Sequence, residues 1–205
     1  MPLPRIRFAS APQRLDALSD GVFAIVLTLL ALELRIPDRE AGESFLRVLL
    51  ANTAVLESYI ISFFVVGVLW RLQHMASELT PRGTPFHHSL TMAFLATVTL
   101  APWSLSNITS FPDDPVAVMG FSGTLLVSWS LLIAILSFAQ GIAPEDKRDE
   151  IRAARRSLFG GPLVACVSLA IAPLSTAGAL YVWLLLIPYG FYARRSVTVG
   201  IDQKW

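Results

Sequence analysis

Residues 14–34 read RLDALSDGVFAIVLTLLALEL, and this stretch decides how the rest of the chain is interpreted. It opens with four polar side chains, Arg14, Asp16, Ser19 and Asp20, and then becomes almost wholly apolar. Ionisable groups at the depth of a membrane are costly, so they usually face a partner or water inside the protein. A helix that only contacts lipid has no need of two carboxylates and an arginine at its mouth. We therefore predict that this helix lines a pathway and that the other helices hold it in place.

The apolar part of the helix carries one stripe whose members recur at steps of three and four residues: Ile25, Thr28, Leu29 and Leu32. That spacing places them on a single helix face. Two interpretations stay open from the residues alone. In the first, the stripe packs against other helices, and Thr28 bonds its own helix backbone. In the second, the aliphatic side chains form a constriction that gates by dewetting, Thr28 offers its hydroxyl to a partly dehydrated ion, and Glu33 favours cations at the extracellular mouth.

Composition indicates an integral membrane protein. The 205 residues are 54% hydrophobic and only 15% charged, with a mean hydropathy of +0.60, whereas a soluble domain carries roughly 25% charged residues. The net charge is +1 and no basic tract is present, so we expect no nucleic-acid partner. With three His, one Cys and no catalytic signature motif, the chain is not expected to be an enzyme or to hold a metal or cofactor.

A membrane helix needs about 20 mostly apolar residues to cross a hydrocarbon core ~30 Å thick. Six stretches of the sequence meet this requirement. They lie at about 15–35, 52–75, 86–106, 116–140, 158–174 and 177–194. Unsatisfied backbone groups are costly in lipid and nothing alternates as barrel strands do, so we predict that every span is a helix. The fold class is therefore an all-α membrane bundle, and residues 1–205 form one six-helix domain.

The sixteen Lys and Arg residues indicate the orientation, because positive loops stay in the cytoplasm. With both termini in the cytoplasm, all of these cations fall on the cytoplasmic side except Arg35, Arg39 and Arg47. We expect a multi-pass protein of the cell inner membrane or plasma membrane. The connection 141–157 has near-balanced charge and is expected to be a solvated cytoplasmic helix or linker.

The second span ends in GVLWRLQHM at 67–75. Trp70 and His74 are separated by four residues and so share a helix face. A Trp near the interface is commonly a belt residue, and a lone His there is commonly a satisfied hydrogen-bonding group. Both nevertheless lie at the cytoplasmic level expected for Arg14 and Asp20.

These motifs resemble those of a known family. The segment RLDALSDG at 14–21 is similar to the R-x-x-x-F-S-D-G/A signature of the transmembrane protein 175 family, the lysosomal potassium channels and their bacterial relatives. GVLWRLQH at 67–74 resembles that family's G-x-x-W-x-x-H-H, and LAPW at 100–103 resembles its L-L-P-F. Leu18 stands where the family has Phe, and Gln73 replaces the first of its two His.

The resemblance implies a homotetramer in a lipid bilayer, with a central pore lined by the first helix of each subunit. It also implies conduction of potassium in preference to sodium without a carbonyl filter. Counting from the matched Asp20, the family's pore-facing positions fall here on Ile25, Thr28, Leu29 and Leu32, the same stripe that the helical spacing selects. The resemblance therefore favours a pore: Ile25 forms the narrowest ring, Leu29 and Leu32 extend the hydrophobic gate, and Thr28 supplies a selective polar ring.

The same resemblance implies that a structural network holds the pore helix, made by Arg14, Ser19, Asp20, Trp70 and His74. We therefore expect a leak-type potassium channel. The alternatives are a proton-permeable channel, a proton-coupled transporter in which Asp20, Glu33 and His74 relay protons, and a non-conducting scaffold. A transporter helix is typically broken by Gly or Pro near the midplane, and the first helix here is not.

Overall fold

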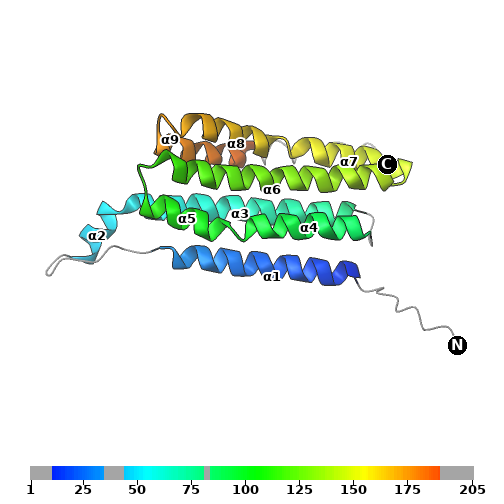
Figure 1. The fold of residues 1–205 in the computed structure, drawn as a ribbon, viewed down its shortest axis with the longest axis horizontal. Helices are drawn as coiled ribbons and strands as arrows, with labels where there is room; N and C mark the ends of the chain where they lie inside the picture. The colour runs from blue at the N-terminus through cyan, green and yellow to red at the C-terminus, as the bar shows by residue number, and fades with distance from the viewer. Residues whose placement is uncertain (1–10, 35–43, 81–83, 190–205) are drawn as a thin grey trace.

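The structure is a computed structural model that describes residues 11–34, 44–80 and 84–189. Within these residues it is all-helical, and its long helices run roughly antiparallel in one bundle (Figure 1). Five segments of the described chain are long and apolar enough to cross a membrane: Arg14–Leu32, Thr53–Leu79, Pro85–Ser110, Pro115–Ile142 and Glu145–Ile171. The expectation of an all-α membrane protein is confirmed at this level.

The elements in chain order are α1 (Ala11–Leu32), α2 (Phe45–Ala51), α3 (Thr53–Leu79), α4 (Pro85–Val98), α5 (Ala101–Ser110), α6 (Pro115–Ile142), α7 (Glu145–Ser157), α8 (Gly160–Ile171), α9 (Thr176–Tyr181) and the 3-10 turn η1 (Val182–Leu185). The predicted sixth span, 177–194, corresponds to the shorter apolar segment Thr176–Tyr189, which η1 interrupts. The last residues of that prediction lie outside the described residues.

Two helices begin with the same local device. At the start of α6 a side-chain oxygen of Asp114 accepts a hydrogen bond of 2.8 Å from the backbone N–H of Val116, and Pro115 follows the cap. At the start of α4 Thr84 caps the helix and Pro85 follows it in the same way. Such caps satisfy backbone donors that have no partner inside the helix, and proline at the first position has no donor to lose.

The bundle is centred on α6, which packs against α3, α4, α5, α7, α8 and α9, whereas α1 lies on one side against α3, α4 and α5 (Figure 1). The largest buried side chains are Trp129 of α6 and Trp183 of η1, whose ring centroids are 6.0 Å apart. The indole N–H of Trp183 donates to the hydroxyl of Ser122 at 3.3 Å. Gly161 lies against Trp129 so closely that an added Cβ would be 2.1 Å from the indole. The packing around these indoles therefore requires glycine at this position of α8.

The third membrane segment has a local interruption, at which Thr99 and Leu100 keep right-handed helical backbone angles. We predicted one helix over 86–106, but a two-residue turn at 99–100 separates α4 from α5. Pro102, just after the turn, has no N–H to donate to the carbonyl four residues earlier, so the helical ladder cannot continue unbroken. Just before the turn, the hydroxyl of Thr97 hydrogen-bonds that of Ser128 on α6 at 2.8 Å. The side chains of α4 and α6 thus fix the helix beside its break.

The connection 141–157 contains a helix, α7, but this helix is not wholly solvated. Ile151 and Ala154 are buried where α7 packs against α6. The first turn of α7 carries two acids and the last turn two arginines, an order that complements the helix dipole. The expectation of a helix was therefore correct for these residues, and the expectation of full solvation was wrong on the face turned to α6.

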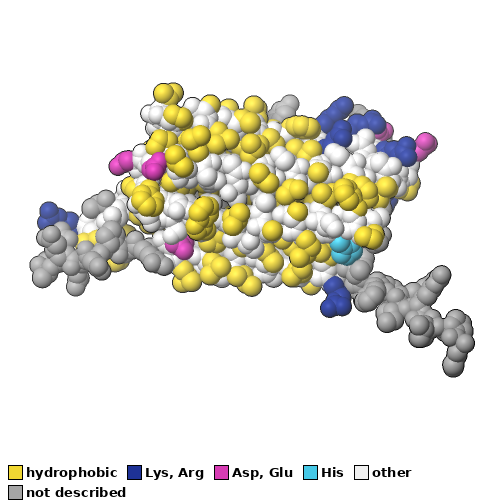
Figure 2. Space-filling view, viewed as in Figure 1, with side chains coloured by type: hydrophobic (Ala, Val, Ile, Leu, Met, Phe, Trp, Pro, Cys, Tyr) yellow, Lys and Arg dark blue, Asp and Glu magenta, His cyan; other side chains and the backbone are white. Residues whose placement is uncertain are grey.

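Charged side chains are distributed unevenly along the bundle. Lys and Arg side chains gather at the end that carries α7, which is also the end where α1 begins (Figure 2). Arg47 lies on α2, which extends from the opposite end of the bundle (Figure 1). Arg35, Arg39 and both termini lie outside the described residues.

Candidate functional site

The helix α1 has one face toward its own protomer and one face turned away. Phe23 and Leu30 are completely or almost completely buried against the bundle. The predicted pore-facing residues Ile25, Leu29 and Leu32 are instead 60%, 41% and 67% exposed. Large apolar side chains at this depth face either lipid or another copy of the chain. The stripe selected by the helical spacing is therefore not part of the core of the protomer.

Thr28 lies on the same exposed side of α1. Its hydroxyl donates a hydrogen bond of 2.8 Å to the carbonyl oxygen of Ile25, which fixes the rotamer. A hydroxyl oxygen has two lone pairs, and donating its proton to the backbone leaves them available to a cation. Glu33 is half-buried just beyond the end of α1, where its backbone N–H donates to the carbonyl of Leu30 at 3.2 Å.

The polar start of α1 is tied to α3. The indole Nε1 of Trp70 donates a hydrogen bond of 2.9 Å to a carboxylate oxygen of Asp20. The ring of Trp70 stacks on that of His74 with a centroid separation of 6.4 Å. His74 Nε2 in turn lies 3.5 Å from the carboxylate of Glu78. Sequence reasoning placed Asp20, Trp70 and His74 at one level, and the structure brings them together.

Two further contacts between α1 and α3 were not predicted. The amide of Gln73 donates to the hydroxyl of Ser19 at 3.3 Å, and both side chains are buried. The hydroxyl of Ser77 donates to the carboxylate of Asp16. On α3, Gln73 and Ser77 follow Trp70 at steps of three and four, so the three face α1 together. This spacing is the signal that could have identified them.

We give the name α1–α3 polar seam to six residues: Asp16, Ser19, Asp20, Trp70, Gln73 and Ser77. Ser19 also donates to the carbonyl of Leu15 at 2.9 Å, so its hydroxyl both donates and accepts a hydrogen bond. Arg14, the remaining predicted member of the network, is exposed and makes no hydrogen bond or ion pair with any described residue.

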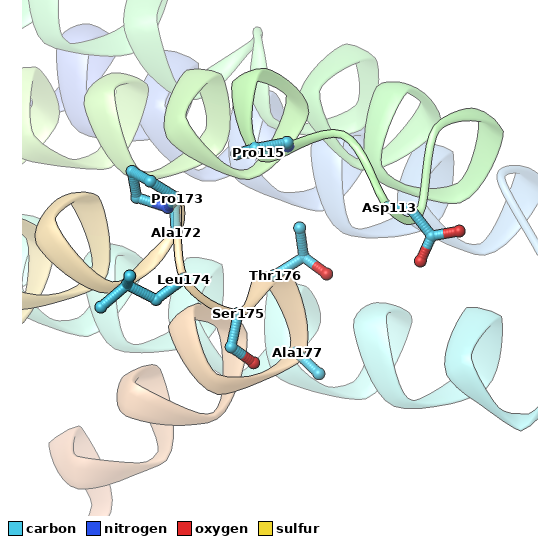
Figure 3. A pocket seen from close by; sticks show the side chains of 8 residues that line it. All are labelled: Asp113, Pro115, Ala172, Pro173, Leu174, Ser175, Thr176 and Ala177. Carbon is cyan, nitrogen blue, oxygen red and sulfur yellow. The ribbon is translucent and has the colours of Figure 1, made fainter.

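The surface of the described residues includes two shallow hollows. One, of about 220 Å³, opens beside the polar seam and is lined by Asp20, Phe23, Ala24, Leu27 and Trp70. The other, of about 240 Å³, is at the opposite end, where the loop before α6 meets the start of α9 (Figure 3). Its one carboxylate, Asp113, lies apart from the hydroxyls of Ser175 and Thr176 in Figure 3. Ser175 is already occupied as the cap of α9, so this hollow has no converging polar groups.

Comparison with known proteins agrees with this geometry. A family model described as the endosomal/lysosomal potassium channel TMEM175 matches residues 14–102, which include the exposed stripe and the whole α1–α3 polar seam. The fold and this match define the chain as a membrane ion channel rather than an enzyme. Over these residues it is similar to the TMEM175 family.

Individual relatives extend the similarity beyond the matched residues. A potassium channel of Streptomyces collinus is 27% identical over 191 residues, covering 87% of this chain and 91% of that protein. The human endosomal/lysosomal proton channel TMEM175 is 26% identical over 194 residues, but the match covers only 38% of the human protein. The crystal structure of a lysosomal potassium-selective channel TMEM175 homologue from Chamaesiphon minutus superposes with a TM-score of 0.79 at 25% identity, covering 90% of this chain and 98% of that one.

Proposed function

We propose that this chain forms a leak-type, potassium-selective cation channel in which α1 of each subunit lines a central pore. The observation that carries the proposal is the exposure of Ile25, Leu29 and Leu32 on a helix whose opposite face is buried. One helix cannot enclose a pathway, so a pore built from this stripe requires a symmetric ring of copies. We take that ring to be a homotetramer.

Each member of the stripe has a separate role in this proposal. Ile25 forms the narrowest ring, and Leu29 and Leu32 extend a hydrophobic constriction that gates by dewetting. Thr28 supplies a ring of hydroxyl oxygens, which is supported by the hydrogen bond that turns its proton toward its own backbone. Glu33 lies at the extracellular mouth, where its charge attracts cations.

The α1–α3 polar seam sets the rotation of the pore helix in this proposal. A rotation of α1 by one residue, about 100°, would turn the stripe away from the axis. The contacts of Asp20 with Trp70 and of Ser19 with Gln73 oppose such a rotation. Arg14, exposed at the cytoplasmic mouth, belongs to the same network and is available to a neighbouring subunit.

The topology proposed with this function has six membrane segments and both termini in the cytoplasm, within one domain. The gathering of Lys and Arg at the end where α1 begins supports that orientation, since cytoplasmic loops are positively charged (Figure 2). The bacterial relatives support a cell membrane as the location. Potassium is the permeant ion, and no cofactor is needed for passive conduction.

A proton-permeable channel is the second candidate, because the human relative is described as a proton channel. A proton-coupled transporter is supported less well. Its broken helices carry substrate-binding and ion-binding groups at the break. Here α1 is continuous, and the break in the third segment is flanked by the hydroxyls of Thr97 and Thr99 rather than by an ionisable group.

The experiment that tests this proposal records the current through purified protein in a planar bilayer, with potassium on one side and sodium on the other. The proposal predicts a reversal potential close to the value for a channel that conducts potassium alone. A reversal potential that instead follows an imposed pH gradient would support the proton channel. Absence of unitary current, with saturable flux still detectable in vesicles, would support the transporter and contradict the channel.

A further inference from the structure

We propose that one flank of α7 and the start of α8 binds the headgroup of an anionic phospholipid in the cytoplasmic leaflet. This flank carries three arginines followed by two large apolar residues, at Arg148, Arg152, Arg155, Phe159 and Leu163. The steps are three or four residues, so on a continuous helix all five share one side. Leu158 and Phe159, which join the two helices, keep right-handed helical backbone angles, so the flank continues across the junction.

The arginines lie beside the last turns of α6, at the depth of lipid headgroups. With 28 residues, α6 is about 42 Å long at 1.5 Å per residue, whereas the hydrocarbon core is ~30 Å thick. The ends of α6 therefore extend into the headgroup layers. Arg155 contacts Ser137 in the last turns of α6, and Arg148 donates to the carbonyl of Ala143, directly after α6.

Each arginine is positioned by one hydrogen bond, and Arg148 also lies 4.0 Å from the carboxylate of Glu145, yet part of each guanidinium is uncommitted. Arg148 Nε donates to a carbonyl at 3.0 Å, Arg152 donates to Asp149 at 2.9 Å, and Arg155 donates to Ser137 at 3.4 Å. A guanidinium has five N–H donors and matches phosphate geometry with two of them at once. The exposed guanidinium N–H groups therefore offer several donors along this side of α7.

The apolar residues identify the ligand as a lipid rather than a free anion. Phe159 and Leu163 are 54% and 66% exposed on the membrane side of the arginines. A phosphodiester on the arginines would thus have its acyl chains beside exposed apolar side chains. Figure 2 shows Lys and Arg side chains gathered over α7. Given the proposed cytoplasmic orientation of this end, the anionic leaflet supplies the complementary charge.

The test uses the purified full-length protein, titrated in detergent with phosphatidylglycerol or with phosphatidylcholine of the same acyl chains, and read by native mass spectrometry. We expect phosphatidylglycerol to bind more tightly. Arg152→Gln should weaken it about fivefold and Arg152→Gln/Arg155→Gln by a factor on the order of 25, since each arginine near the surface contributes about 1 kcal/mol. Lys147→Gln removes the same charge from outside this flank, since Lys147 is in line with Ile151 and Ala154, and it should leave the affinity close to that of the unchanged protein.

Equal binding of the two lipids would overturn the proposal. So would an equal loss in Lys147→Gln and Arg152→Gln, because the attraction would then come from net charge alone. Inorganic phosphate that binds as tightly as phosphatidylglycerol would show a simple anion site instead. Because Arg155 also contacts α6, the exposed single variant Arg152→Gln keeps the test valid if the double variant fails to fold.

Discussion

The indole N–H of Trp70 and the carboxylate of Asp20 are joined by a hydrogen bond of 2.9 Å across 50 positions of the chain. The bond connects α3 to α1 one and a half turns before Ile25, the first residue of the exposed stripe. With the contacts of Ser19 with Gln73 and of Asp16 with Ser77, it is one of three long-range polar contacts on a helix whose other buried side chains are apolar. Apolar contacts tolerate a helix rotation better than a hydrogen bond does. The rotation of α1 therefore depends strongly on this pair and its neighbours in the polar seam.

Trp70→Phe removes the donor while keeping an aromatic ring, although a smaller one. We expect a loss of about 1 kcal/mol of stability, and a lower yield of the proposed tetramer, measured by size-exclusion chromatography with light scattering. Asp20→Ala should have the same effect, and the double variant should be little worse than either single one. Trp103→Phe is the control, because Trp103 is exposed and its indole makes no hydrogen bond to a described residue. Normal assembly with altered permeation in Asp20→Ala would place that carboxylate in the ion pathway instead.

A double-mutant cycle tests the contact between Asp16 and Ser77. The single variants Asp16→Ala and Ser77→Ala should each lower the thermal unfolding temperature, and the double variant should lower it by less than their sum. The expected coupling is about 1 kcal/mol, the usual value for a hydrogen bond with one charged partner in a partly solvated position. Additive effects would show that the two side chains act independently. Ser89→Ala serves as the control, since that exposed hydroxyl bonds only its own helix backbone.

Gly161→Ala should destabilise the protein by about 1–3 kcal/mol, because the new methyl group would overlap the indole of Trp129. Thermal unfolding in detergent measures the effect. Gly120→Ala is the matched control, since an added Cβ there meets nothing within 4 Å, and it should be neutral or slightly stabilising. Equal stability of the two variants would show that the Trp129–Trp183 cluster can shift to make room.

The sequence was sufficient to predict most of the helices. It was also sufficient to single out Asp20 and Trp70 of the polar seam, because both predictions depend on local patterns. Hydrophobic length identified the membrane segments, and the three-and-four spacing identified the exposed stripe of α1. Asp20 and Trp70 stood out because polar and aromatic groups are uncommon inside such segments. The partners of Asp16 and Ser19 were missed, because Ser77 and Gln73 become their neighbours only through the register of α3 against α1. That register is set by packing of the whole bundle.

The interruption at 99–100 was missed for a different reason. Pro102 gave a local signal, but proline is tolerated in membrane helices when other groups satisfy the freed backbone. Whether it kinks a helix or divides it depends on contacts such as the hydrogen bond between Thr97 and Ser128, which joins two helices. Likewise, the burial of Ile151 on α7 follows from contact with α6, and the local charge pattern gave no sign of it.

Thr28→Val tests the proposed selective ring, because valine has nearly the shape of threonine but no hydroxyl. We expect the preference for potassium over sodium to fall, since dehydrated ions would lose an oxygen ligand in the constriction. The measurement is the reversal potential in mixed potassium and sodium solutions. Thr99→Val is the control: its hydroxyl makes the same bond to the carbonyl three residues earlier, at 2.8 Å, but lies outside α1. A loss of selectivity in Thr99→Val alone would move the selective site to the broken segment.

Ile25→Asn tests the gate directly. If Ile25 forms the narrowest hydrophobic ring, an amide in its place holds water in the constriction, and removal of the dry barrier should raise single-channel conductance and weaken selectivity. Ile60→Asn is the matched control, because Ile60 is a similarly exposed isoleucine on α3, at 53% against 60%, and the proposal places it away from the axis. Bilayer recordings of the two variants at equal protein yield separate the possibilities. Unchanged current and selectivity in Ile25→Asn would mean that the stripe faces lipid, and the pore would then have to be formed by another helix.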